Sequence, residues 1–255
     1  MLVRIYFVAF VFLFFISCMQ DKIETPADNH SLEYFPLNLG KFITYSVDSI
    51  VFDDVAGGNK KDTVSFQIKE EVVSYQIDLA GDTIFYLHRF RRSTSEDPWL
   101  ITDLWTANRS TVEASRTEEN LKFRKMTFPL RSGKRWSATT YIPFSTTVVI
   151  GTEMMQPYQE WESKVLDFDV SGQVGIFSFE AGQLMHISQS DTDDGSMKRF
   201  EQEVYARNIG LVSRTDSLLD SRCLTLGYFE PCFDETWLEK AGKGYILSQV
   251  MIDHN

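Results

Sequence analysis

The sequence predicts an all-β fold, either an antiparallel barrel or a strongly curved sheet of more than ten strands, with at most one or two short helices. Three observations support this prediction. Apolar and polar residues alternate along most of the chain, clusters of Gly, Asn and Asp separate the alternating segments, and aromatic residues make up 14% of the chain. Alternation with a period of two is typical of half-buried strands, and short segments separated by turns are typical of antiparallel sheets.

The alternating segments give the positions of the expected strands. For example, Ile84 and Tyr86 alternate with Phe85 and Leu87. The expected strands, in chain order, span residues 42–52, 64–77, 83–92, 100–106, 111–116, 121–128, 135–141, 146–150, 164–170, 183–189, 197–206, 210–219 and 245–252. Short helical segments are expected only at residues 154–162 and 235–240.

Residues 1–17 have the layout of a secretory signal peptide. A short basic start precedes the apolar residues 5–16, which as a helix would span about 18 Å, less than the roughly 30 Å of a bilayer core. The segment FISC, which ends at Cys18, resembles the bacterial lipobox, with Phe in place of the usual leucine. This resemblance implies cleavage before Cys18 and acylation of that cysteine, so that the chain is anchored to a membrane by lipid.

Residues 18–32 are polar, and we expect them to form a flexible lipidated tether ahead of a single β-rich domain at residues 33–255. Met19, rather than aspartate, follows the cysteine, which favours the outer membrane. The domain would then lie on either the periplasmic face or the cell surface.

The formal net charge of −11 argues against nucleic acid as a partner, because both would be negative. Two cysteines remain in the mature chain, Cys223 and Cys232, with eight residues between them. In an oxidising compartment we expect them to form a disulfide. A metal pair is the alternative, but no histidine lies nearby and the spacing is wrong for zinc.

One short motif occurs twice. The segment FPLNLGK at 35–41 recurs as FPLRSGK at 128–134, which is 93 residues later, and each copy precedes an expected strand. Glycine permits a turn, and proline is harmless just before a strand. The repeat indicates either two similar strand starts or two duplicated halves, about 33–127 and 128–255.

The same region carries a resemblance to a protein family. The segment YFPLNLGKFITY at 34–45 resembles the YFPLxxGxxWxY opening of many Bacteroidota lipoproteins of unassigned activity, with Ile43 in place of tryptophan. The segment EVYARNIGLV at 203–212 resembles their EVYAKGIGLV strand pair, and GYI at 244–246 resembles their closing strand. The resemblance implies a β-rich outer-membrane lipoprotein and assigns no activity.

No arrangement of residues in the sequence favours catalysis. The G-x-S-x-G, HExxH and CxxC motifs and glycine-rich phosphate loops are absent, so we expect no enzyme, no cofactor and no metal site. His88 and His186 lie on expected strands, where a half-buried histidine is the simpler interpretation. Asp167 and Asp169 share an expected strand face and would be solvated. Residues 191–195 (DTDDG) predict a tight hairpin turn rather than a calcium loop.

Aromatic residues are the remaining candidates for a binding surface, because they could line a cavity or groove. They are Trp99, Trp105, Trp136, Trp161, Trp237, Tyr158 and Tyr228. The sequence thus predicts a non-enzymatic, lipid-anchored binding or envelope-assembly domain, whose ligand-binding residues are unknown. The alternative is a lipocalin-like binder or carrier of a lipid or other hydrophobic ligand. The expected partners are the membrane, through Cys18, and an envelope protein or a hydrophobic ligand.

Overall fold

The alternating segments form one antiparallel sheet of twelve strands. The computed structural model describes residues 29–53, 60–159, 161–223 and 230–255. The strands of the sheet are β1 (Phe42–Asp53), β2 (Lys60–Ile77), β3 (Thr83–Arg92), β4 (Leu100–Arg109), β5 (Glu113–Glu118), β6 (Leu121–Thr127), β7 (Arg135–Trp136), β10 (Ser163–Val174), β11 (Phe177–Asp193), β12 (Met197–Ala206), β13 (Gly210–Ser221) and β14 (Ala241–His254).

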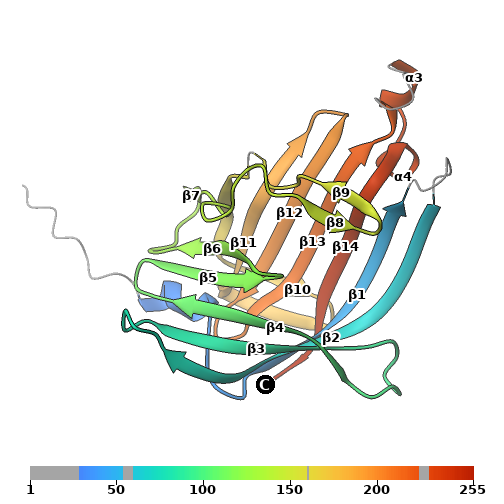
Figure 1. The fold of residues 1–255 in the computed structure, drawn as a ribbon. Helices are drawn as coiled ribbons and strands as arrows, with labels where there is room; N and C mark the ends of the chain where they lie inside the picture. The colour runs from blue at the N-terminus through green and yellow to red at the C-terminus, as the bar shows by residue number, and fades with distance from the viewer. Residues whose placement is uncertain (1–28, 54–59, 160, 224–229) are drawn as a thin grey trace, which may run out of the picture.

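The strand order is β6-β5-β4-β3-β2-β1-β14-β13-β12-β11-β10-β7. The sheet curves so strongly that β3 to β6 cross the long strands β11 to β14, giving a nearly closed barrel (Figure 1). In the described ranges, helix is limited to short pieces, namely the 3₁₀ helix η2 (Asn29–Tyr34), α3 (Glu230–Phe233) and α4 (Trp237–Lys240). The all-β prediction is therefore confirmed. Within these ranges, no helix combines the length and the apolar character that crossing a bilayer requires.

The barrel has two seams, at which its N-terminal strands (β1 to β6) meet its C-terminal strands (β7 and β10 to β14). At the first, which we call the ladder seam, β1 and β14 pair from Ile43↔His254 to Phe52↔Gly244. At the second, the open seam, the sheet edges β6 and β7 approach each other. There the Arg124 N–H donates to the Ala138 carbonyl at 2.8 Å, and the Trp136 Nε1–H donates to the Arg124 carbonyl at 3.0 Å. The open seam therefore closes through isolated hydrogen bonds rather than a ladder.

A segment that we call the strap, residues 137–162, connects β7 to β10. It contains the small hairpin of β8 (Val148–Ile150) and β9 (Glu153–Met155), which lies against β14 (Figure 1). The Thr152 Oγ1–H donates to Asp53 Oδ1 at 2.8 Å, and Lys243 Nζ donates to the Met154 carbonyl at 3.3 Å. These contacts fix the strap across the barrel.

Two sequence predictions fail within the strap. The strand expected at 135–141 ends at Trp136, because the chain turns at Thr139, whose carbonyl accepts the Ile142 N–H at 2.8 Å. The helix expected at 154–162 does not form. Residues 153–155 pair with β8 instead, and Pro157 has no N–H for a helical hydrogen bond.

The two copies of the repeated turn have the same backbone geometry. Gly40 and Gly133 have φ values of 76° and 77°, in the left-handed region that glycine adopts readily. The Gly40 N–H donates to the Val72 carbonyl at 2.8 Å, and the Gly133 N–H donates to the Val165 carbonyl at 2.8 Å. Each copy precedes six strands of the sheet. The repeat is therefore a repeat of structure as well as of sequence.

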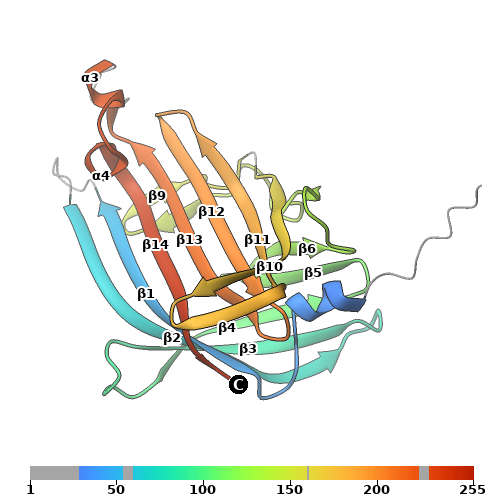
Figure 2. The ribbon, with the colours of Figure 1, turned by 180° about the vertical axis from the view of Figure 1, so that it is seen from behind.

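The described residues begin at Asn29, ahead of residue 33, where the domain was expected to start. The η2 helix lies at the end of the barrel where the β4–β5 and β12–β13 turns meet (Figure 2). Ser31 is buried and its Oγ accepts the Leu130 N–H at 3.0 Å, and Arg109 donates to the Leu32 carbonyl at 2.9 Å. These contacts hold residues 29–32, which were expected to belong to the tether. The signal peptide, Cys18 and the rest of the tether lie outside the described residues.

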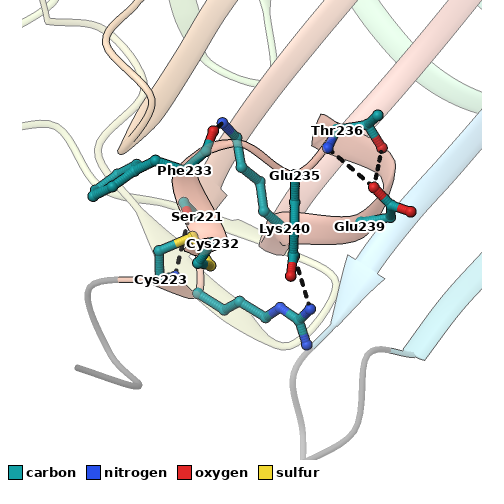
Figure 3. Close-up of a disulfide and its surroundings, with 9 residues drawn as sticks. Ser221, Cys223, Cys232, Phe233, Glu235, Thr236, Glu239 and Lys240 are labelled. Atoms are coloured by element: carbon teal, nitrogen blue, oxygen red, sulfur yellow. Dashed lines mark hydrogen bonds and ion pairs between the residues drawn. A yellow bond between two sulfur atoms is a disulfide. The ribbon is translucent and has the colours of Figure 1, made fainter. Parts of the chain in front are cut away.

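The predicted disulfide is present between Cys223 and Cys232 (Figure 3). Their Cα atoms are 5.6 Å apart, within the range for a disulfide. The expected helical turn at 235–240 is shorter, and it is α4, which begins after Thr236. The Thr236 N–H and Oγ1–H both donate to Glu239 Oε2, at 3.1 and 2.9 Å. This capping arrangement satisfies an otherwise free donor at the start of α4.

Candidate functional site

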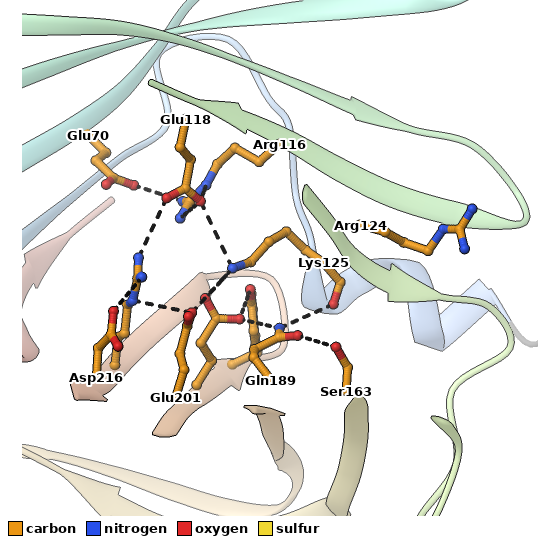
Figure 4. Close-up of polar contacts among 12 residues, drawn as sticks. Glu70, Arg116, Glu118, Arg124, Lys125, Ser163, Gln189, Glu201 and Asp216 are labelled. Carbon is orange, nitrogen blue, oxygen red and sulfur yellow. Dashed lines mark hydrogen bonds and ion pairs between the residues drawn. The ribbon is translucent and has the colours of Figure 1, made fainter. Parts of the chain in front are cut away.

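Nine charged side chains meet inside the barrel, and we call them the charged network. Figure 4 labels Glu70, Arg116, Glu118, Lys125, Glu201 and Asp216 among them. Pairs two residues apart on a strand, such as Arg116 with Glu118 and Arg214 with Asp216, share the inward face. The network comprises the carboxylates Glu70, Glu118, Glu201, Glu203 and Asp216 and the cations Arg89, Arg116, Lys125 and Arg214. All five carboxylates are buried.

Lys125 joins the two sides of the open seam. It lies on β6, and its Nζ reaches across the barrel to β12, 2.5 Å from Glu203 Oε1 and 3.6 Å from Glu201 Oε1. It also lies 3.9 Å from Glu118. Because Lys125 and Glu203 are both almost fully buried, removing either would leave the other charge uncompensated.

The two arginines on β5 and β13 extend this bridging. Arg214 contacts three carboxylates: Asp216 at 2.9 Å and Glu201 at 3.3 Å on its own side, and Glu118 at 3.5 Å on the opposite side. Arg116 contacts Glu118 at 2.7 Å and Glu70 at 3.3 Å. Glu118 is therefore held by cations from both sides of the open seam.

Neutral hydrogen-bond donors complete the coordination of two carboxylates. Glu203 Oε2 accepts the Tyr205 hydroxyl at 2.9 Å and the Gln189 amide at 2.6 Å. The Tyr245 hydroxyl donates to Asp216 Oδ2 at 2.6 Å. These donors restrict the orientations of the two carboxylates.

The pKa values within the network diverge. Burial opposes ionisation of Glu118, but Arg116, Lys125 and Arg214 together lower its pKa. Burial also opposes ionisation of Glu203, yet the same cations, led by Lys125, hold its pKa below the ordinary value. By contrast, burial raises the pKa of Glu201 to about 8 and raises the pKa of Asp216, in spite of Arg214 and Lys125. The cations therefore offset the cost of burying the charges of Glu118 and Glu203, but they do not offset it for Glu201 and Asp216.

A cavity of about 210 Å³ lies against the charged network. Its lining combines charged and aromatic side chains from both sides of the open seam and from the strap: Arg89, Trp105, Glu118, Glu119, Phe123, Lys125, Tyr158, Trp161, Glu201, Arg214, Asp216, Leu218, Tyr245, Leu247 and Gln249. Glu119 is exposed at the rim. The cavity can therefore hold a small molecule against fixed charges.

The aromatic wall of this cavity is itself ordered. Tyr158 and Trp161 of the strap pack edge to face with ring centroids 5.5 Å apart, and Tyr158 packs against Phe123 at 5.4 Å. The Trp161 Nε1–H donates to the Pro157 carbonyl at 2.8 Å, which fixes the indole. On the other wall, the guanidinium of Arg89 lies 4.5 Å from the centre of the Trp105 ring.

Two carboxylate oxygens in the lining, Asp216 Oδ1 and Glu201 Oε1, have no hydrogen-bond donor within the described ranges, but Glu201 Oε1 forms an ion pair with Arg214 Nε at 3.3 Å. Asp216 is 1% exposed, and both of its contacts, with Arg214 and Tyr245, use Oδ2. Among the described residues no hydrogen-bond donor reaches Asp216 Oδ1. A buried acceptor without a partner is costly, so this atom marks a place for a donor from outside the chain.

A second cavity, lined mostly by apolar side chains that include Leu37, Val72 and Leu87, has a volume of about 60 Å³. This is room for about two water molecules at ~30 Å³ each. Such a volume is less than a third of that of the cavity beside the charged network.

Some of the candidate aromatic residues line the charged cavity, and others lie elsewhere in the barrel. Trp105, Trp161 and Tyr158 line the charged cavity, as the sequence suggested for some of them. Trp136 is buried at the open seam. Trp99 and Trp237 are half-buried, and Tyr228 lies outside the described residues.

The other sequence candidates lie outside the cavity. His88 is half-buried, with its ring 6.0 Å from that of Phe90. Asp167 is exposed and lies 3.6 Å from His186. Asp169 is also exposed, but a β-bulge interrupts the strand there, and it accepts hydrogen bonds from Tyr34 and Arg207.

The predicted hairpin turn lies at residues 194–196, because 191–193 extend β11; in this turn Asp194 Oδ1 accepts the Ser196 and Met197 N–H groups at 2.9 and 2.8 Å. The described residues contain no group of three His, Cys, Asp or Glu side chains suited to hold a metal ion.

Sequence reasoning missed the charged network. On β12, Glu201, Glu203 and Tyr205 face inward, whereas the more apolar alternate positions, Phe200 and Val204, are less buried. This inverts the usual pattern of apolar residues inside and polar residues outside. The available signal was the recurrence of like-spaced charges on several strands, at 116 and 118, 201 and 203, and 214 and 216.

Comparison with known proteins finds similarity only among solved structures. No protein-family model matches the chain, and no curated protein is significantly similar to it. One similar structure is provisionally described as an exported protein with a YmcC-like fold from Bacteroides fragilis, with 11% identity and a TM-score of 0.43. Another is provisionally described as a lipoprotein from Parabacteroides distasonis, with 8% identity and a TM-score of 0.39. Each comparison covers 87% of this chain and 98% of the other.

Proposed function

We propose that this chain is a lipid-anchored protein of the bacterial outer membrane that binds a small polar molecule inside its barrel without transforming it. The observation that carries the binding proposal is the cavity of about 210 Å³, whose lining joins fixed charges to aromatic rings. Pockets that combine apolar walls with a few convergent polar groups are typical ligand sites.

The anchor proposal rests on the leader. Its apolar segment is too short to span a bilayer and stops at Cys18, a thiol that can be acylated. Met19 after the cysteine supports transfer to the outer membrane. The described residues begin at Asn29, ten positions after Met19.

The arrangement favours holding a ligand over transforming one. The ionised carboxylates Glu118 and Glu203 are each engaged by cations at short range, which leaves neither of them free as a nucleophile or base. The lining also weighs against the alternative of a hydrophobic ligand, because an apolar molecule would leave the buried Asp216 Oδ1 without a donor. The mostly apolar cavity is too small for an acyl chain.

The anchor is tested with the Cys18→Ala variant grown with a clickable fatty acid. The wild-type protein should be labelled and sediment with membranes, whereas the variant should be unlabelled. Equal labelling of the two proteins would contradict the anchor at Cys18. A Cys223→Ala, Cys232→Ala double variant is the control, and it should keep the label.

Binding is tested by thermal unfolding of the mature protein in detergent against small sugars, polyols, amines and amino acids. A ligand present at about 100 times its Kd stabilises by about 2.7 kcal/mol, which for a domain of this size raises Tm by roughly 5–10 °C. A Tyr158→Ala, Trp161→Ala variant should lose the shift. Stabilisation by apolar solutes alone, or by none of the set, would contradict the proposal.

A further inference from the structure

The charged network is short of one positive charge. Its five carboxylates face four cations, and each cation already contacts at least two carboxylates of the network or its rim. Two further carboxylates near the rim, Asp103 and Glu119, add to the negative side. A buried site with excess negative charge attracts a cation from solution.

The missing donor and the missing charge occur at the same place. Asp216 lines the cavity, and its buried Oδ1 has no donor among the described residues. Its neighbour on the next strand, Tyr245, donates to the other oxygen, so Oδ1 is the Asp216 oxygen left for a ligand. A group that carries both N–H donors and a positive charge satisfies both requirements.

The aromatic wall suits the same group. The face of an aromatic ring carries negative potential and attracts cations within about 6 Å. In this barrel Trp105 already has two guanidinium groups near its ring, those of Arg89 at 4.5 Å and Arg116 at 4.9 Å. Tyr158 and Trp161 line the cavity, and no cation lies over their rings among the described contacts, so no protein cation in the described ranges occupies that position.

We propose that the cavity binds a small molecule through a protonated amino group, which donates to Asp216 Oδ1 and lies against the rings of the strap. This inference rests on the proposed binding function and names its ligand class. The volume of about 210 Å³ suits a small bound group, such as a six-membered ring with its substituents.

The binding should be linked to a proton. The groups that face Glu201 are Arg214 and Asp216 on β13, Lys125 on β6 and Glu203 on β12. With the pKa of Glu201 raised to about 8, this residue carries a proton at neutral pH, and that proton offsets the excess charge. An ammonium group would take over this role, so binding at pH 7 should release a proton, and the affinity should rise between pH 6 and pH 8.

The first experiment uses the wild-type mature protein in detergent. Isothermal titration at pH 7 compares cyclohexylamine with cyclohexanol, which have the same ring, and with glucose. We expect the amine to bind at least about tenfold more tightly than either neutral compound. We also expect its binding to release protons, which is measured as a binding enthalpy that changes with the ionisation enthalpy of the buffer. Equal or tighter binding of cyclohexanol or glucose would overturn the amine inference and leave the binding function standing. A failure of every solute in the wider screen would overturn both.

The second experiment tests the contact itself. Asp216→Asn keeps the shape of the side chain and removes its charge, and it should weaken binding of cyclohexylamine by at least about tenfold. Asp220→Asn is the matched control, because Asp220 lies on the same strand but pairs with Arg199 and Lys243 outside the cavity. It should bind as the wild type does. Wild-type affinity in a folded Asp216→Asn protein would overturn the inference, and the wild-type titration decides the matter if this variant does not fold.

Discussion

The two seams of the barrel are closed by different kinds of interaction. Along the ladder seam, β1 and β14 pair at ten positions through the backbone. Along the open seam, two hydrogen bonds to Arg124 join the edges, and ion pairs inside the barrel connect the strands on either side. Backbone ladders bring side chains of neighbouring strands into close register, whereas ion pairs leave space between the walls.

The difference begins just after the repeated turn. After the first copy, residues 42–53 alternate and form the long β1. After the second copy the strand stops at Trp136, and the strap begins. Tyr158 and Trp161 of the strap then line the cavity. A shortened strand in one half thus provides the room for a binding site that the other half lacks.

The largest effect should come from breaking the ion pairs at the open seam. Lys125→Ala would leave Glu203 buried without its closest cation, 2.5 Å away, and should destabilise the protein by about 3–5 kcal/mol. Urea unfolding followed by tryptophan fluorescence measures this loss.

Lys122→Ala is the matched control on the same strand. Lys122 is exposed and its Nζ lies 4.5 Å from the centre of the Tyr141 ring, so its loss should cost no more than about 1 kcal/mol. Equal losses for the two variants would show that the interior ion pairs do not hold the open seam.

The next effect is a pH dependence that the charged network predicts. The folded state raises the pKa of Glu201 from 4.5 to about 8, so between these values the folded protein binds a proton that the unfolded chain has lost. Stability should therefore fall by a few kcal/mol from pH 5 to pH 8. Below pH 4.5 the lowered pKa values of Glu118 and Glu203 act in the opposite direction, so stability should fall there too as these groups gain protons.

Glu201→Gln should remove most of the decline between pH 5 and pH 8, because it fixes the neutral form. Urea midpoints at several pH values measure both proteins. An unchanged decline in the variant would assign the pH dependence to other groups.

The smallest effect compares the two turns directly. Gly40→Ala and Gly133→Ala each place a side chain at φ near 76°, with no atom within 4 Å to clash with it, so the cost is that of the backbone conformation. Each should destabilise by about 1 kcal/mol. Thermal unfolding should give similar losses. A large loss of stability for only one of them would show that the two turns are not equivalent. The difference between the two seams would then already be present in the turns that precede β1 and β7.

Local patterns predicted the strands, because alternation, turns and capping residues act between near neighbours in the chain. They also predicted the pairing of Cys223 with Cys232, which are close in sequence. The pairing of Lys125 with Glu203 depends on how the barrel closes, and alternation on β6 and β12 does not contain that information. The stop after Trp136 was missed because residues 137–141 continue to alternate weakly, although the chain turns at Thr139.

The site itself was predicted only through its aromatic residues. Trp105, Trp161 and Tyr158 were candidates by type, whereas the buried carboxylates were passed over. Burial of charge is costly, so sequence patterns assign acidic residues to the surface by default. The network avoids that cost through partners that only the folded barrel brings together.

The most direct test of the cavity as a binding site follows the tryptophan indole N–H signals by NMR during titration with a solute that stabilises the protein. Trp105 and Trp161 line the cavity, whereas Trp237 donates to Asp193 at a distant hairpin. Binding in the cavity predicts that the signals of Trp105 and Trp161 shift together with a common Kd while that of Trp237 stays in place. Saturable binding that leaves Trp105 and Trp161 unmoved would contradict the account.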